Sequence, residues 1–218
     1  MPAPMSGRKA QAARNDKIIA EAARKVFVAD PSAPIAAVAE AAEVGISALY
    51  RRYPSKEDLL RKVCADGLEI YTALVQEGVD ALQDGAGDPW AAFENVMRRV
   101  VEADTHSITV ALAGTFTPSP ELFAASERAN TLNAALVERA HAAGVLRPDV
   151  TDEDLGPIFE QLAAVHVENG RRTHALRQRY LTLYLDGLRT PPATSPLPWG
   201  GPTDEEREEP WIPKVSRT

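Results

Sequence analysis

The sequence of 218 residues has little of the material from which catalytic and metal sites are built. It contains one cysteine, Cys64, and four histidines. A single cysteine forms no internal disulfide and, without partner ligands, no zinc site. The histidines show no metal-binding spacing, and no nucleophile elbow, phosphate-binding loop or paired-cysteine motif is present. We therefore expect no catalytic site, no metal and no cofactor.

Long apolar runs are also missing. No stretch approaches the roughly 18 to 20 apolar residues that span a bilayer, and the N-terminal segment lacks the apolar core of a signal peptide. We therefore expect a cytoplasmic protein with no membrane partner. At 44% hydrophobic and 25% charged residues, the composition is that of a globular protein with one large or two small cores.

The charge is unevenly distributed along the chain. The net charge of −7 argues by itself against a nucleic-acid partner. However, residues 1–65 hold 11 Lys and Arg against 7 Asp and Glu, a balance of +4, and the remainder carries −11. Such asymmetry is typical of a DNA-binding domain attached to a body that does not touch DNA.

The basic third contains the most informative stretch, residues 34–57, which read PIAAVAEAAEVGISALYRRYPSKE. Its apolar residues lie on two short helical faces separated by residues 43–45. Gly45 suits the cap of the second helix, and Pro54 with Ser55 ends that helix and caps the next. Two helices joined by a turn of about three to four residues place a recognition helix in the major groove of DNA.

Side chains on and beside the second helix suit DNA contact. A tyrosine and three cations lie within two turns, where they can bind phosphates and fix the register. Residues 46–48 form the first turn, which reaches base edges in this geometry. Because they are small or apolar, we expect thymine-methyl contacts, one hydrogen bond from Ser47, and readout partly through DNA shape. The predicted DNA-contacting residues are Pro34, Ala36, Ile46, Ser47, Ala48, Tyr50, Arg51, Arg52 and Lys56.

This stretch resembles the N-terminal DNA-binding domain of TetR-family transcriptional regulators. The resemblance covers roughly residues 14–60 and rests on AEVGISALY (42–50) and YPSKEDL (53–59). Glu43 departs from the family pattern because it stands where the turn glycine is usual, and Gly45 stands where a serine cap is common. Glutamate is a costly residue in a left-handed turn. The resemblance implies an all-helical homodimer whose C-terminal domain binds a small molecule and thereby releases DNA.

Helical periodicity continues through the rest of the chain. The predicted fold is all-α, with an N-terminal three-helix helix-turn-helix domain and a C-terminal helical bundle for ligand binding and dimerisation. The predicted divisions are a flexible arm (1–13), the DNA-binding domain (14–60), the regulatory domain (61–189) and a Pro-rich acidic tail (190–218). Besides the helix-turn-helix, we expect helices over about 14–29, 56–82, 89–101, 107–116, 120–143, 154–165 and 173–188. The helix from Lys56 spans about 40 Å, long enough to link both domains.

A ligand pocket is predicted from aromatic and polar residues on the helices that surround a cavity in similar proteins. Five large apolar side chains and three polar anchors make up the set. They are Trp90, Phe93, Met97, His106, Phe116, Phe123, His166 and Asn169. Plain core packing is the alternative for each of them. A ligand bound there would be a mostly apolar or aromatic small molecule.

The last two helices are adjacent and antiparallel, so they are well placed to pair with their copies as a four-helix bundle. The resemblance implies the same homodimer interface. The residues predicted to form it are Leu155, Phe159, Leu162, Leu176, Tyr180, Leu183 and Tyr184.

Taken together, these features predict a ligand-released repressor that binds a palindromic operator in double-stranded DNA as a dimer. One alternative keeps the DNA-binding domain but places it under a protein partner, or under no effector at all. A helical enzyme is the remote alternative from a different class.

Overall fold

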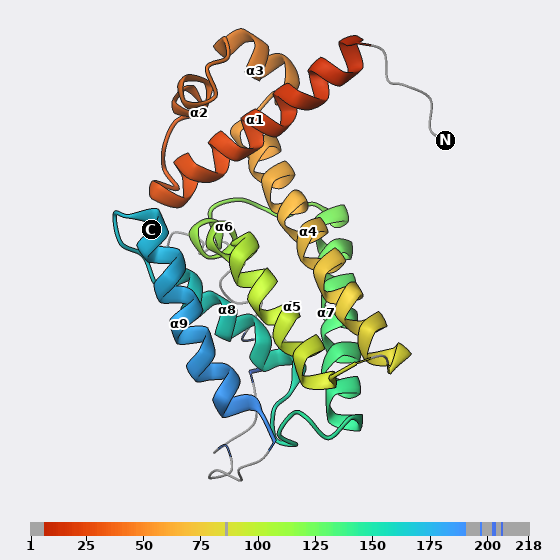
Figure 1. The fold of residues 1–218 in the computed structure, drawn as a ribbon. Coiled ribbons are helices and arrows are strands. Elements are labelled where there is room, and N and C mark those ends of the chain that lie inside the picture. The colour runs from red at the N-terminus through yellow and green to blue at the C-terminus, as the bar shows by residue number, and fades with distance from the viewer. Residues whose placement is uncertain (1–6, 86, 191–196, 198–201, 204–205, 207–218) are drawn as a thin grey trace, which may run out of the picture.

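The computed structural model describes residues 7–85, 87–190, 197, 202–203 and 206, with side chains from residue 14 onward. Every regular element in this part of the chain is a helix, so the predicted all-α fold is confirmed (Figure 1). The elements are α1 (Gly7–Ala29), α2 (Ile35–Ala41), α3 (Ile46–Arg52), α4 (Lys56–Asp84), α5 (Pro89–Ala103), α6 (Thr105–Leu112), α7 (Pro120–Ala142), a 3-10 turn (Asp152–Asp154), α8 (Leu155–Ala164) and α9 (Gly170–Leu188). None of the described helices is both long and apolar enough to cross a membrane.

The first three helices and the start of α4 form a unit at one end of the molecule, the head (Figure 1). Its apolar core is built around Phe27, Val38 and Leu49, all of which are fully buried. Ile108 and Leu112 of α6 belong to the same core. The core of the head is therefore not formed by the N-terminal helices alone, because α6 contributes part of it.

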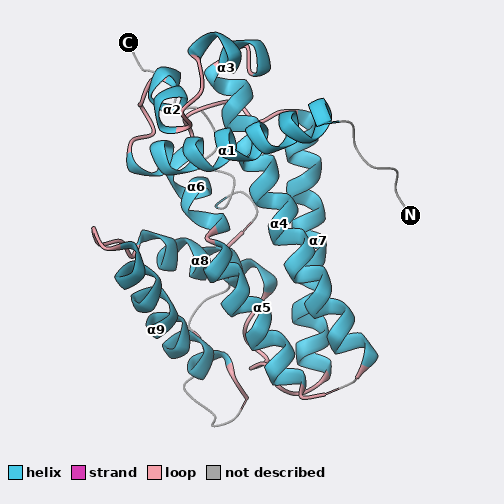
Figure 2. Ribbon diagram, turned by 45° about the horizontal axis from the view of Figure 1, so that its top comes forward, coloured by secondary structure: helices cyan, strands magenta, loops and turns pink. Residues whose placement is uncertain are grey.

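Helix α4 connects the head to the remaining helices, the body (Figures 1 and 2). It begins with the predicted capping box: the Asp58 N–H donates to Ser55 Oγ, and the Ser55 N–H donates to Asp58 Oδ2, each at 3.1 Å. Two otherwise unpaired donors are thereby satisfied. The helix ends at Asp84, where Gly85 takes the left-handed conformation at no Cβ cost. The predicted long connecting helix is confirmed.

In the body, α5 and α7 pack against α4, and α4 and α7 run side by side (Figure 2). Helices α8 and α9 pack against each other and against α5. The fully buried side chains at their centre include Phe93, Met97, Leu136, Leu155, Leu162 and Leu181. Helices α4 and α5 approach closely at Gly78, where an added Cβ would lie 2.1 Å from Cγ2 of Val96. Glycine at this position lets the two helices touch.

The predicted N-terminal arm is shorter in the structure than in the sequence prediction. Helix α1 begins at Gly7, so residues 7–13 are helical rather than an irregular arm. Residues 1–6 lie outside the described part of the chain, as does most of the predicted tail, residues 190–218.

Two helix boundaries in the body also differ from prediction. Helix α6 ends at Leu112, earlier than predicted, and Gly114 follows with a φ of 71°. Helix α9 begins at Gly170, earlier than predicted, because the side chain of Asn169 accepts a hydrogen bond from the Arg172 N–H at 3.1 Å and caps the helix. A capping side chain fixes a helix start more firmly than the apolar pattern does.

Candidate DNA-binding surface and ligand cavity

The turn between α2 and α3 is closed by backbone hydrogen bonds. The Glu43 N–H donates to the Glu40 carbonyl and the Val44 N–H to the Ala39 carbonyl, both at 3.0 Å. This is the helix end in which the first residue past the cap is left-handed, and Glu43 has a φ of 54°. A residue with a Cβ carries a strain of about 1–2 kcal/mol there. Gly45 then caps α3 in an extended conformation, as predicted.

Helix α3 is anchored on one side and exposed on the other. Leu49 is fully buried beneath it. Tyr50 and Ile46 are 47% and 40% exposed, which is high for large apolar side chains. Ser47 and Arg51 are exposed as well. The outer face of α3 thus combines apolar, hydroxyl and cationic groups. Apolar and hydroxyl groups can contact base edges, and cationic groups can contact phosphates.

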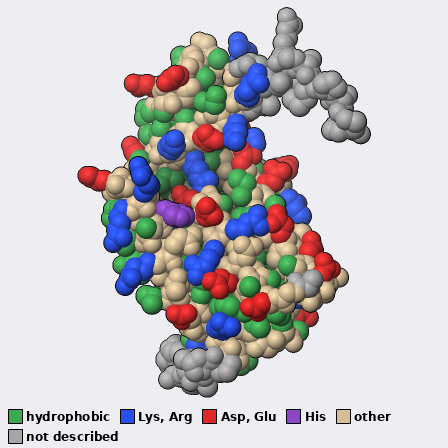
Figure 3. Space-filling view, viewed as in Figure 1, with side chains coloured by type: hydrophobic (Ala, Val, Ile, Leu, Met, Phe, Trp, Pro, Cys, Tyr) green, Lys and Arg blue, Asp and Glu red, His purple; other side chains and the backbone are tan. Residues whose placement is uncertain are grey.

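The remaining predicted contacts on the head are also accessible. Pro34 and Ala36 at the start of α2 are exposed, and Ala48 is half-buried. Lys and Arg side chains are visible on the head, interspersed with acidic ones (Figure 3).

Two of the predicted phosphate contacts are engaged within the subunit. Arg52 Nε donates to Asp16 Oδ1 of α1 at 2.8 Å. Lys56 Nζ donates to the carbonyls of Pro31 and Ala33, each at 2.8 Å, and lies 5.0 Å from the centroid of the Phe27 ring. The Lys56 ammonium therefore joins the α1–α2 loop to α4, a structural role that the sequence analysis did not predict, and its predicted phosphate contact stays a prediction. The sequence shows the charge of Lys56 but not the carbonyls that surround it.

A cavity of about 380 Å³ lies between α4, α6, α7 and α8. Its volume is in the range of small-molecule sites. At its polar end, the Tyr71 hydroxyl donates to Asn133 Oδ1 at 2.6 Å. The ring of His106 packs edge-on against Tyr71, with centroids 5.2 Å apart, and tilted against Phe159 at 4.9 Å. The Nδ1 atom of His106 lies 3.1 Å from the hydroxyl of Thr105.

Burial keeps the deep groups of the cavity uncharged. It lowers the pKa of His106 to about 4, an effect that nearby Asp104 opposes only in part. It raises the pKa of Tyr71, and it raises the pKa of the Cys64 thiol to about 12. At neutral pH these three lining groups are therefore an imidazole, a phenol and a thiol without charge. Cys64 is buried and behaves as a small apolar residue, as the sequence indicated.

All the charged side chains that line the cavity among the described residues are acidic. They are Glu127, Asp152, Glu160 and Glu206. Burial raises the pKa of Glu160. The aromatic ring of Phe123 also lines the cavity and is 52% exposed.

The structure brings together only two of the residues predicted for the pocket, His106 and Phe123. Trp90, Phe93 and Met97 are instead packed into the core of the body. Their apolar spacing indicates burial, but a side chain that fills a core leaves no room for a ligand.

The other three predicted pocket residues also lie elsewhere. Phe116 belongs to the core that the head shares with α6. His166 is exposed in the loop before α9. Asn169 caps α9. Polar residues that interrupt an apolar helical stripe were the better signal, because Tyr71 and Asn133 meet inside the cavity.

The predicted dimer contacts divide between surface and core. Leu183 and Tyr180 of α9 are 64% and 40% exposed. Leu155, Phe159 and Leu162 of α8 are buried within the subunit, so they cannot contact a second copy in this conformation. Leu176 and Tyr184 are half-buried. The predicted interface is therefore limited to the exposed side of α9, because the apolar stripe of α8 packs into the body.

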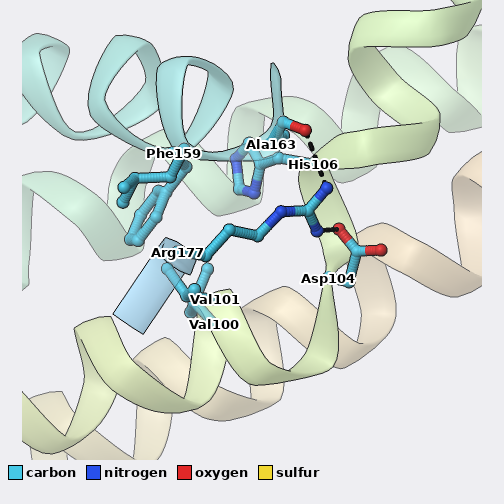
Figure 4. Close-up of a pocket in the computed structure, with 8 residues that line it drawn as sticks. Val100, Val101, Asp104, His106, Phe159, Ala163 and Arg177 are labelled. Atoms are coloured by element: carbon cyan, nitrogen blue, oxygen red, sulfur yellow. Dashed lines mark hydrogen bonds and ion pairs between the residues drawn. The ribbon is translucent and has the colours of Figure 1, made fainter. Parts of the chain in front are cut away.

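Asp104 lies between α5 and α6, where the body meets the head, and Figure 4 shows it paired with Arg177. Arg177 of α9 reaches it through Nη1 at 2.6 Å and also donates to the carbonyls of Ala163 and Val165 at 2.7 and 3.0 Å. Arg24 of α1 donates to the neighbouring carbonyl of Ala103 at 3.0 Å, and its Nη2 lies 3.9 Å from Asp104 Oδ2. One carboxylate thus links α1, the α5–α6 junction and α9.

Two sequence models of protein families match the chain. The model described as bacterial regulatory proteins of the tetR family matches residues 19–63, which include α2 and α3. The model described as the C-terminal domain of SbtR-like transcriptional regulators matches residues 88–190, which include α5 to α9. The chain belongs to the TetR family. It is therefore a DNA-binding transcriptional regulator and not an enzyme, and both the resemblance and the predicted function are confirmed at this level.

Individual TetR-family relatives extend the comparison. The repressor LfrR of Mycolicibacterium smegmatis is 28% identical over 188 residues, covering 83% of this chain and 94% of LfrR. The crystal structure of LfrR in complex with proflavine superposes with a TM-score of 0.57 at 23% identity, covering 82% of this chain and 99% of that one. A TetR regulator from Mycobacterium vanbaalenii superposes with a TM-score of 0.54 at 25% identity, covering 84% and 99%.

Proposed function

We propose that this TetR-family protein is a repressor that binds a palindromic operator as a homodimer and is released by a small molecule bound in the cavity. Residues 14–60 would serve as the DNA-binding domain and residues 61–189 as the regulatory and dimerisation domain. The related LfrR is named a repressor, and its structure is described as a complex with proflavine. Two heads would meet half-sites about 34 to 36 Å apart, or a multiple of that distance.

The observation that carries this proposal is the position of α6. Thr105 and His106 in its first turn line the cavity. Asp104, the residue before them, contacts Arg24 of α1. Further along α6, Ile108 is packed into the core of the head. A ligand that displaces the first turn of α6 would therefore act on α1 both through the ion pair and through shared packing.

Release by a ligand requires two conformations that the ligand binds with different affinity. The head would occupy one orientation without ligand and another with it. Because the recognition helices of a dimer must match the spacing of the half-sites, a small rotation of each head is sufficient to weaken operator binding. The junction at Asp104 is the contact that such a rotation would alter.

The test begins with selection of genomic fragments bound by the purified protein, which yields the operator. Binding of that operator is then measured for Tyr50→Ala and Arg51→Ala, both of which should weaken binding to every sequence. Only Arg51→Ala should also flatten the salt dependence, since a cation that contacts a phosphate releases counterions. Ser47→Ala should instead change the base preference. Arg171→Ala, an exposed site on α9, is the control and should bind as the wild type does.

Control by a ligand is tested by screening for compounds that raise the melting temperature and also weaken operator binding. If the purified protein binds no DNA duplex even at low salt, DNA binding by α3 is refuted. If the operator is bound but no compound releases it, the ligand-released part of the proposal fails and control by a protein partner takes its place.

A further inference from the structure

We propose that the cavity between α4, α6, α7 and α8 selects an organic cation with a flat apolar body. The inference deepens the proposed function, since it assigns a chemical class to the effector of that same cavity. It goes beyond the sequence prediction of an apolar or aromatic ligand, because it adds a required positive charge.

The first argument is the sign of the charges. The charged side chains lining the cavity in the described part of the chain are all carboxylates, with no Lys or Arg among them. Several carboxylates elsewhere in the described chain do have basic partners, since Glu57 pairs with Arg61 and Glu94 pairs with Arg98. The cavity therefore presents a one-sided negative field, and such a field raises the local concentration of cations.

The second argument is that two of these carboxylates have no partner of their own. Among the described residues, the carboxylates of Glu127 on α7 and Glu160 on α8 form neither a hydrogen bond nor an ion pair. Glu206 differs, since its Oε2 accepts from the Thr203 N–H at 2.8 Å. The two unpartnered groups come from different helices that border the same space. Both residues are exposed, so a cation that enters the cavity can approach either carboxylate directly and gain an attractive charge interaction.

The third argument comes from the uncharged lining. Phe123 is 52% exposed although it is an aromatic residue, and it lines the same cavity as the carboxylates. The face of an aromatic ring attracts a cation and also stacks on flat apolar groups. Deeper in the cavity, Asn133 is only 8% exposed, and its Oδ1 is occupied by Tyr71, which leaves its amide N–H groups for a ligand acceptor.

Other occupants suit this lining less well. An anion would face unpaired carboxylates with no basic side chain to compensate it. A bare metal ion lacks a site, because the described residues contain no group of three metal-ligating side chains in reach of one another. A neutral aromatic compound would contact Phe123 but would gain no charge interaction with Glu127 and Glu160.

The experiment compares three flat tricyclic compounds that differ in charge at neutral pH: proflavine, a cation; acridine, which is neutral; and anthracene-9-carboxylate, an anion. Binding to the full chain is measured by calorimetry without DNA, since acridines insert between base pairs. We expect proflavine to bind on the order of tenfold more tightly than acridine, and the anion to bind more weakly than both. Of the three compounds, only proflavine should bind more weakly when salt is added.

Variants assign the effect to the two carboxylates. Glu127→Gln and Glu160→Gln should each weaken proflavine binding, by only about threefold to tenfold because both residues are exposed and solvent screens their attraction for the cation. Acridine binding should change by less than about twofold. Glu138→Gln is the matched control, since Glu138 lies on α7 with Glu127, is exposed, and does not line the cavity.

The charge inference is overturned if acridine or the anion binds as tightly as proflavine, if none of the three binds, or if the variants weaken proflavine and acridine equally. Each of these outcomes leaves the proposed function standing when some other compound releases the operator. Conversely, charge-dependent proflavine binding that leaves the operator bound would support the ligand class and count against release by ligand.

Discussion

Arg177 on α9 and Asp104 at the start of α6 form a hydrogen-bonded ion pair, with Nη1 and Oδ1 2.6 Å apart. Only 7% of Arg177 is exposed. Its charge therefore depends on this carboxylate and on two backbone carbonyls for compensation. Since Arg24 of α1 lies 3.9 Å from the same carboxylate, the pair is also where the body meets the head.

Replacing Asp104 with asparagine removes the charge alone. Asparagine has nearly the same size and tolerates the left-handed φ of 51° at this position. We expect the free energy of unfolding to fall by about 1 to 3 kcal/mol, less than for a fully buried pair because the Asp104 side chain is 39% exposed. Urea denaturation measures the change, and Glu102→Gln, at an exposed neighbouring position, should have no effect. Wild-type stability in Asp104→Asn would show that the pair contributes nothing.

Lys56→Met tests the structural role assigned to the lysine. Methionine retains the hydrocarbon stem but cannot donate to the carbonyls of Pro31 and Ala33. We expect a loss of about 1 to 3 kcal/mol in the free energy of unfolding. Lys25→Met, an exposed site on α1, is the control. A variant that keeps full stability but loses operator affinity would contradict the structural role and support the predicted phosphate contact of Lys56.

The dimer prediction now depends on α9. Leu183 is 64% exposed, so an aspartate there costs a single subunit little. In a dimer paired through α9, Leu183→Asp would bury unpaired charge at the interface and should yield monomers with little operator affinity. Analytical ultracentrifugation reads out the assembly state. Ile70→Asp, at an exposed apolar site on α4, should remain dimeric; an intact Leu183→Asp dimer would place the interface elsewhere.

The buried His106 predicts a pH dependence of stability. An unfolded histidine has a pKa near 6.5, whereas burial lowers the pKa of His106 to about 4. Between these values the unfolded chain binds the proton and the folded chain does not, so stability falls as the pH drops from about 6.5 to about 4. Against His106→Phe, which keeps a ring but cannot titrate, the wild type should lose about 1 to 3 kcal/mol more over this window. Parallel pH profiles would contradict the buried neutral imidazole.

Gly78→Ala tests the close approach of α4 and α5. In an open helix this substitution stabilises by up to about 1 kcal/mol. At Gly78 the new methyl would lie 2.1 Å from Val96 Cγ2, so we expect a net loss of about 1 to 3 kcal/mol. Gly187→Ala, with nothing near its Cβ position on α9, should gain slightly or stay neutral. Guanidinium unfolding of both variants measures the difference, and equal behaviour would mean that the helices separate freely.

Local chemistry made much of the fold predictable. The Ser55 and Asp58 side chains satisfy each other's backbone donors at the start of α4, and such a cap is visible in four consecutive residues. The cap of Asp88 before Pro89 at α5 is equally local. Family resemblance added the arrangement of the helices in space, which periodicity alone does not supply.

The cavity was harder to predict because its position depends on where the helices leave space that no side chain fills. Trp90 and Tyr71 lie on apolar stripes and are both buried, but only Tyr71 borders empty space. Several helices together determine which apolar stripe borders the cavity. The sequence of one helix does not contain this information. The same limit applies to Lys56, since its two carbonyl partners lie more than 20 residues away in the chain.

The shared packing around Ile108 limits how modular this regulator is. A chimera that grafted residues 14–60 onto the body of another family member would remove Ile108 and Leu112 from the core that they share with Phe27 and Leu49. Such hybrids should misassemble unless α6 is transplanted with the recognition helix. If the proposed function holds, specificity for an operator and response to an effector would therefore be inherited together, as one unit.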